Sequence, residues 1–172
     1  MPYRKSYKPY RRNYSSNKKK WCPIYKDVTP TQMNIASGQI NGSFFTIAAN
    51  ASENVVQSPV PTVIKIKHIK CAMDFKTDST AVSNGFCCFL YCPQGITASS
   101  AVVQAHPEWM LAWRSIPNDV SASHQTIMLN TSLSRNLNSG DSVVCFFSFL
   151  NYSGGDVIVS VTGRATAVVR NN

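Results

Sequence analysis

The chain has 172 residues, of which 44% are hydrophobic and 15% are charged, so it can bury one full core but is too short for two comfortable domains. Its formal charge of +9 is unevenly placed: residues 1–27 carry nine Lys or Arg against one Asp (+8), which leaves eight basic against seven acidic residues (+1) for residues 28–172. A protein that needed charge only for solubility would spread it, so this division predicts a basic arm (1–27) followed by a nearly neutral domain (28–172).

We expect neither a signal peptide nor insertion into a membrane. The basic N-terminus is not followed by an apolar run, and prolines interrupt it. No apolar stretch reaches the roughly eighteen residues that a membrane span requires.

The first twenty residues contain eight Lys or Arg, four Tyr and no acidic residue. Such a pattern suits single-stranded nucleic acid, because cations neutralise phosphates while aromatic rings, Trp21 included, stack on bases. Nothing in the segment could read a base sequence, and a solubility tail or a nuclear localisation signal at residues 18–20 is the alternative. The candidate nucleic-acid-binding residues of the arm are Arg4, Lys5, Lys8, Arg11, Arg12, Lys18, Lys19, Lys20, Tyr3, Tyr7, Tyr10 and Tyr14.

Beyond Trp21 the chain consists of short runs rich in β-branched and aromatic residues, separated by Gly-, Asn- and Ser-containing turns. No window shows a sustained helical periodicity, although residues 111–114 could form one helical turn. Eight strands with uneven loops predict an all-β sandwich, of which the jelly roll is the eight-stranded form. The expected strands cover residues 32–36, 43–48, 62–75, 84–91, 109–114, 124–131, 142–150 and 156–169.

Two of these strands carry a clear pattern of faces. In residues 156–170 apolar side chains alternate with polar ones, which predicts one buried and one solvated face. In residues 62–75 the alternation changes phase after His68, as a β-bulge would cause. The solvated faces of these two strands could form one sheet face that carries four cations. This face is either an ordinary polar surface or a nucleic-acid-binding surface that adds to the charge of the arm. Its candidate nucleic-acid-binding residues are Lys65, Lys67, Arg164 and Arg170.

The segments GFCCFLYC (85–92) and VVCFFSFL (143–150) are apolar on both faces. An outer sheet with one solvated side should not have this composition. Either loops of the same chain cover the second face or another subunit does, and we favour self-association.

The six cysteines do not form a recognisable metal or disulfide pattern. The cluster at residues 87–92 has no partner cluster at zinc-site spacing, so we expect buried, reduced thiols, with zinc as the alternative. We therefore predict no metal and no cofactor.

Two segments invite a catalytic interpretation. Residues 140–142 (Gly-Asp-Ser) lie at a turn before a strand, outside any nucleophile-elbow pattern, and His106 and Glu108 flank a proline in a loop. No second carboxylate or metal ligand stands at a recognisable spacing from this pair. We predict no catalytic residue and no enzymatic activity.

Four blocks resemble capsid proteins of small circular single-stranded DNA viruses, the CRESS group. These are IKHIKCAMDF (66–75), CPQG (92–95), HPEWMLAWR (106–114) and LSRNLNSGDSV (133–143), and their order and spacing match that family's pattern. The resemblance covers most of residues 62–150, and the arm agrees with it in composition.

The resemblance implies a jelly roll in which the first, third, sixth and eighth strands share one sheet. It also implies a sixty-subunit T=1 icosahedral shell whose arms face inward on packaged genomic DNA. The expected locations are the virion and, during assembly, the host nucleus, with a host receptor and nuclear import factors as further partners. Trp109, Trp113 and Arg114 become candidate subunit-interface residues, or else members of the intrachain core.

Two other functions fit the same residues. A coat protein of a small single-stranded RNA virus would have the same arm, because no feature of the arm recognises a 2′-hydroxyl group. A cellular single-strand-binding module with a basic tail would stay small instead of forming particles.

Overall fold

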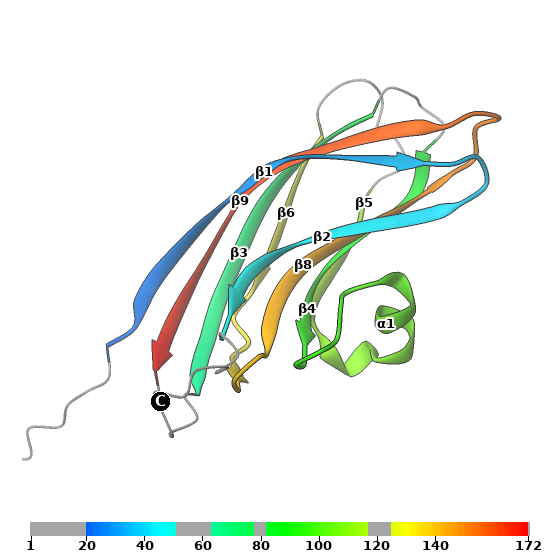
Figure 1. Ribbon diagram of the computed structural model, residues 1–172. Coiled ribbons are helices and arrows are strands. Elements are labelled where there is room, and N and C mark those ends of the chain that lie inside the picture. The colour runs from blue at the N-terminus through cyan, green and yellow to red at the C-terminus, as the bar shows by residue number, and fades with distance from the viewer. Residues whose placement is uncertain (1–19, 51–62, 78–81, 117–124, 172) are drawn as a thin grey trace, which may run out of the picture.

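The computed structural model describes residues 20–50, 63–77, 82–116 and 125–171, and these are mostly β-strands (Figure 1). The strands, together with one short helix and one 3-10 turn, are β1 (Cys22–Ile35), β2 (Ile40–Ala49), β3 (Ile64–Thr77), β4 (Val82–Cys92), α1 (Ser100–Ala105), η1 (Pro107–Trp109), β5 (Met110–Ile116), β6 (Gln125–Thr131), β7 (Arg135–Leu137), β8 (Ser142–Asn151) and β9 (Val157–Asn171). Within the described residues, no helix is long and apolar enough to cross a membrane.

The strands form two antiparallel sheets that pack face to face. Sheet A has the order β1-β9-β3-β6, with the short β7 also paired to β3, and sheet B has the order β2-β8-β4-β5. When β7 is set aside, the first, eighth, third and sixth strands share sheet A, and the second, seventh, fourth and fifth share sheet B. This is the strand order of a jelly roll, so the predicted fold class is confirmed.

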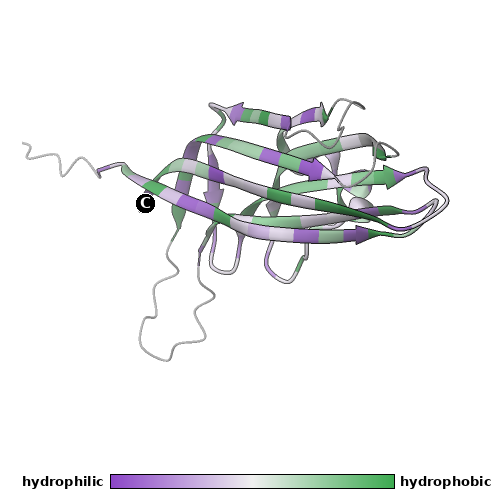
Figure 2. Cartoon of the chain, turned by 90° about the horizontal axis from the view of Figure 1, so that it is seen from above, coloured by the Kyte–Doolittle hydropathy of each residue, from purple (hydrophilic) through white to green (hydrophobic). Residues whose placement is uncertain are grey.

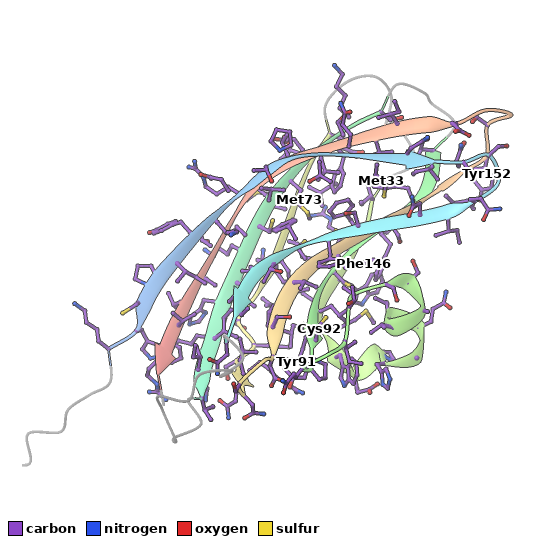
Figure 3. All side chains as sticks on the ribbon, viewed as in Figure 1. Met33, Met73, Tyr91, Cys92, Phe146 and Tyr152 are labelled. Atoms are coloured by element: carbon purple, nitrogen blue, oxygen red, sulfur yellow. The ribbon has the colours of Figure 1, made fainter. Side chains whose placement is uncertain are left out.

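The core lies between the two sheets and follows from the two-residue periodicity of their strands. Phe75 of sheet A contacts Phe147 and Phe149 of sheet B edge-on, with ring centroids 5.8 and 5.4 Å apart. Met33 and Met73 belong to the same buried layer (Figure 3). Figure 2 shows hydrophobic and hydrophilic residues following one another along the long strands. The buried core between the two sheets consists of apolar side chains from these strands.

The predicted bulge at His68 is confirmed. The register between β3 and β9 shifts between Lys67 and Lys70, and His68 has a backbone φ of 51°. Ile66 and Ile69, on either side of the bulge, are both fully buried. The extra residue therefore lets the apolar side chains of both halves of β3 face the core.

Strand β1 begins ten residues earlier than the sequence predicted. It contains Pro23 and Pro30, but β1 is an edge strand, where a missing N–H need not disturb the ladder. Cys22 already pairs with Val169 of β9, so the expected division between residues 27 and 28 falls inside β1. Residues 111–114 lie in β5 and do not form a helical turn.

Helix α1 was not predicted, and it covers part of the outer face of sheet B (Figure 1). Val102 and Val103 of the helix pack on a second buried cluster that contains Cys88, Leu90 and Phe146. The two-sided apolar character of β4 and β8 is thus explained partly by the chain's own helix. Part of this face stays open beside α1.

Gly163 provides a test of how closely the strands of sheet A approach one another. A Cβ atom at this position would lie 2.3 Å from the carbonyl oxygen of Ala72, whereas a Cβ atom at Gly154 would meet nothing within 4 Å. We predict that Gly163→Ala lowers the free energy of unfolding by about 2 kcal/mol or more, because β3 and β9 must separate to admit the methyl group. Gly154→Ala should change it by less than about 0.5 kcal/mol. Equal effects of the two substitutions in urea denaturation would contradict this packing.

Candidate nucleic-acid interface

The N-terminal segment enters the folded domain on the outer face of sheet A. Lys20 is exposed, and the other predicted arm residues, from Tyr3 to Lys19, lie outside the described residues. Trp21, directly before β1, contacts two cationic side chains through its ring. The Nζ atom of Lys67 lies 4.1 Å from the ring centroid, and the guanidinium carbon of Arg170 lies 4.8 Å from it. These cation–π contacts attach the root of the arm to β3 and β9.

The predicted cations of the domain gather beside Trp21. Lys65 stands opposite Arg170 in the pairing of β3 with β9, and Lys67 stands opposite Val168, on the same face. Lys65, Lys67 and Arg170 are all half-buried. Within the described part of the chain, neither Lys65 nor Lys67 forms an ion pair with a carboxylate. The structure thus brings together three of the four cations that the sequence placed on this face.

Arg164 lies on the same face but outside this group. It is six residues before Arg170 on β9, about 20 Å along the strand. Its Nε atom donates a hydrogen bond to Oδ1 of Asp27 at 2.7 Å, and this contact raises the pKa of Arg164. Both side chains are exposed, so this ion pair adds little to the stability of the fold. Asp27 nevertheless balances the positive charge of Arg164, which the sequence analysis had predicted to contact a phosphate.

Two residues that the sequence analysis missed extend the group. Tyr25 of β1, with 73% of its surface exposed, stands opposite Thr166 of β9, which in turn stands opposite Lys70 of β3. Because β1 begins at Cys22, the two-residue alternation from Trp21 through Pro23 to Tyr25 places Tyr25 on the same face as Trp21. This alternation was the sequence signal that could have indicated Tyr25. We call Trp21, Tyr25, Lys65, Lys67, Lys70 and Arg170 the basic face.

Trp109, one of the three predicted interface residues, packs against other residues of the same chain. It packs against both buried clusters, and the His106 ring stacks on it with centroids 3.8 Å apart and an interplanar angle of 8°. His106 also contacts Glu108, with Nδ1 3.0 Å from Oε1. The pKa of Glu108 is lowered by a hydrogen bond from its own backbone N–H and then by His106. This cluster ties η1 to the sandwich.

Arg114 and Trp113 have different surroundings, although they are neighbours on β5. Arg114 donates from Nη1 to the backbone oxygen of Met128 at 3.1 Å, which links sheet B to sheet A. Trp113 stacks on Phe86 and leaves 63% of its surface exposed. Of the three predicted interface residues, Trp113 is therefore the one that exposes a large apolar surface.

Asp141, from the Gly-Asp-Ser segment, has a structural role. Its carboxylate is buried and accepts hydrogen bonds from the Tyr91 hydroxyl at 2.7 Å, from the Asn138 N–H at 2.9 Å and from the Gln94 N–H at 3.2 Å. Burial and the hydrogen bond to Asp141 both raise the pKa of Tyr91. The segment is a turn held by its acidic side chain, as its composition predicted.

Five of the six cysteines are buried and Cys22 is exposed. Burial raises the pKa of Cys87 and Cys88 to about 12 and that of Cys92 to about 11, so these thiols stay protonated at neutral pH and pack as small apolar groups. Among the described residues, no three His, Cys, Asp or Glu side chains are grouped as metal ligands would be.

Comparison with known proteins gives matches among solved structures alone, because no family model and no curated protein matches the chain. The structure of infectious bursal disease virus Gx strain is similar at 10% identity and a TM-score of 0.43, over 88% of this chain and 32% of that chain. The 60-mer BFDV capsid protein is similar at 12% identity and a TM-score of 0.40, over 90% of this chain and 95% of that chain. The chain thus spans about a third of the former protein and nearly all of the latter. The jelly-roll fold itself is established by the strand order.

Proposed function

We propose that this chain is a viral capsid protein. Its jelly-roll domain self-assembles into a closed icosahedral shell, with sixty subunits as in the family that its sequence resembles. Its basic arm and basic face bind packaged single-stranded nucleic acid without sequence preference. The observation that carries the proposal is the contact of the Trp21 ring with Lys67 and Arg170, because it roots the arm on a face that already bears cations.

The chemistry of the basic face fits the backbone and bases of a single strand. Its cations supply charge to phosphates, and binding gains free energy from the release of condensed counterions. The exposed ring of Tyr25 offers a flat surface on which an unpaired base can stack. Neutralisation by nucleic acid also removes the repulsion between arms that a shell would bring close together.

The outer face of sheet B provides the surface for self-assembly. An apolar groove of about 270 Å³ beside α1 is lined by Ile40, Phe86, Val103, Phe146 and Leu150 together with polar but uncharged side chains. Ile40 is 60% exposed, and Trp113 lies on the same face of the sheet. Since no charged side chain lines the groove, the basic arm is a poor occupant, and we propose that a second copy of the chain covers it.

The remaining details of the proposal depend on the sequence resemblance. DNA is favoured over RNA as the packaged strand only by the four matching blocks. The virion is the proposed location, with assembly in the host nucleus served by residues 18–20 and with a host receptor as an external partner. We propose no enzymatic activity.

The basic face predicts a local effect of charge removal on nucleic-acid binding. Lys67→Gln removes a cation beside Trp21, whereas Lys76→Gln removes one at the other end of the same strand, opposite Ser160. In anisotropy titrations of the full chain with an oligothymidylate, Lys67→Gln should weaken binding and reduce the slope of log K against log salt by about 0.7, the value for one phosphate contact on a single strand. Lys76→Gln should leave the slope unchanged. Equal slopes for the two variants would remove the basic face from the proposal.

The groove predicts a surface-specific loss of assembly. Ile40→Ser alters the open face of sheet B, and Ile158→Ser makes the same change at a 43% exposed position on the outer face of sheet A. We predict that Ile40→Ser folds normally but forms fewer particles in light scattering and electron microscopy, and that Ile158→Ser assembles like the natural chain. Normal assembly of Ile40→Ser would show that the groove is not a subunit contact.

A further inference from the structure

A polar pocket of about 370 Å³ lies where β7 pairs with the first residues of β3. It is separate from the apolar groove of sheet B, and the sequence analysis did not point to it. Its walls are formed by Lys65, Tyr91, Ser134, Arg135, Asn136 and Asn138.

Arg135 is held in place over an aromatic ring. Its guanidinium carbon lies 4.2 Å from the centroid of Tyr91, and the hydroxyl of Tyr91 is itself fixed by its hydrogen bond to Asp141. A guanidinium has five N–H donors, so one that contacts an aromatic side chain can still donate to the oxygen atoms of a ligand.

The pocket combines two cations with neutral hydrogen-bonding groups. Lys65 and Arg135 carry the charge, while Ser134, Asn136 and Asn138 can donate hydrogen bonds. No carboxylate lines the pocket, and the nearby Asp141 already accepts three hydrogen bonds from within the chain. A ligand that suits this set is an anion with several oxygen acceptors.

We propose that this pocket binds a phosphate group, with Arg135, which lies over Tyr91, donating to its oxygens and Lys65, which lines the pocket from the opposite face of sheet A, supplying a second charge. The pocket adjoins the basic face, because Lys65 stands opposite Arg170 on one side and opposite Asn136 on the other. The phosphate can therefore come from the backbone of a strand on the basic face or from a free phosphate or nucleotide. Binding of inorganic phosphate alone does not depend on the capsid function proposed above.

The test compares the melting temperature of the full chain in low-millimolar inorganic phosphate and in chloride at equal ionic strength. Ligands that bind the folded state raise the melting temperature, whereas phosphate on the arm does not stabilise the folded domain. Asn136→Asp places a carboxylate at the pocket on an exposed position of β7. Asn130→Asp makes the same change on an exposed position of β6, opposite Lys70, and serves as the control.

We expect phosphate to raise the melting temperature of the natural chain and of Asn130→Asp, and this rise to disappear in Asn136→Asp and in Arg135→Gln. The absence of a rise in the natural chain, or an undiminished rise in Asn136→Asp, would overturn the proposal. A second arm adds an oligothymidylate without terminal phosphates. If it binds more weakly to Asn136→Asp than to Asn130→Asp, the pocket takes a backbone phosphate, and equal binding assigns it to a free phosphate group.

Discussion

The pairing of β9 with both β1 and β3 is the constraint on which the candidate interface depends. Because β9 runs between them, the start of β1 lies beside the end of β9 and near the first residues of β3. Trp21, Arg170 and Lys67 meet there, although they are far apart in the sequence. The same pairing places Lys65 between Arg170 and the β7 strand that forms the phosphate pocket. One sheet order therefore produces the root of the arm, the basic face and the pocket.

The two sheets expose different kinds of surface. Sheet A exposes charge and two aromatic rings at the end where the arm begins, and its one ion pair between described residues, Arg164 with Asp27, lies further along. Sheet B exposes apolar side chains around a groove without charged walls. In the proposed capsid, a nearly neutral body lets copies approach one another, while the excess charge is kept on a segment that nucleic acid can neutralise. This separation of charge from apolar contact is what a shell around an anionic polymer requires.

The sequence predicted the features that depend on local periodicity. The buried face of residues 157–169 and the bulge at His68 follow from a two-residue alternation and its single change of phase. The all-β sandwich follows from the count of short β-type runs, and the jelly-roll strand order was implied by the family resemblance. The first half of β1 was missed because Pro23 and Pro30 are acceptable only on an edge strand, which is a property of the completed sheet. Likewise, the neutralisation of Arg164 and the pocket around Arg135 depend on strand register, which local patterns do not determine.

The most direct test of the account is a comparison of the full chain with a chain that lacks residues 1–20. The β-sandwich of the shortened chain keeps all its described strands, so it should fold, as judged by circular dichroism and thermal melting. Nuclease treatment followed by ultraviolet absorbance then measures how much nucleic acid each protein protects. The account predicts that the shortened chain loses most of the protected nucleic acid while staying folded. Protection equal to that of the full chain would contradict the proposed role of the arm.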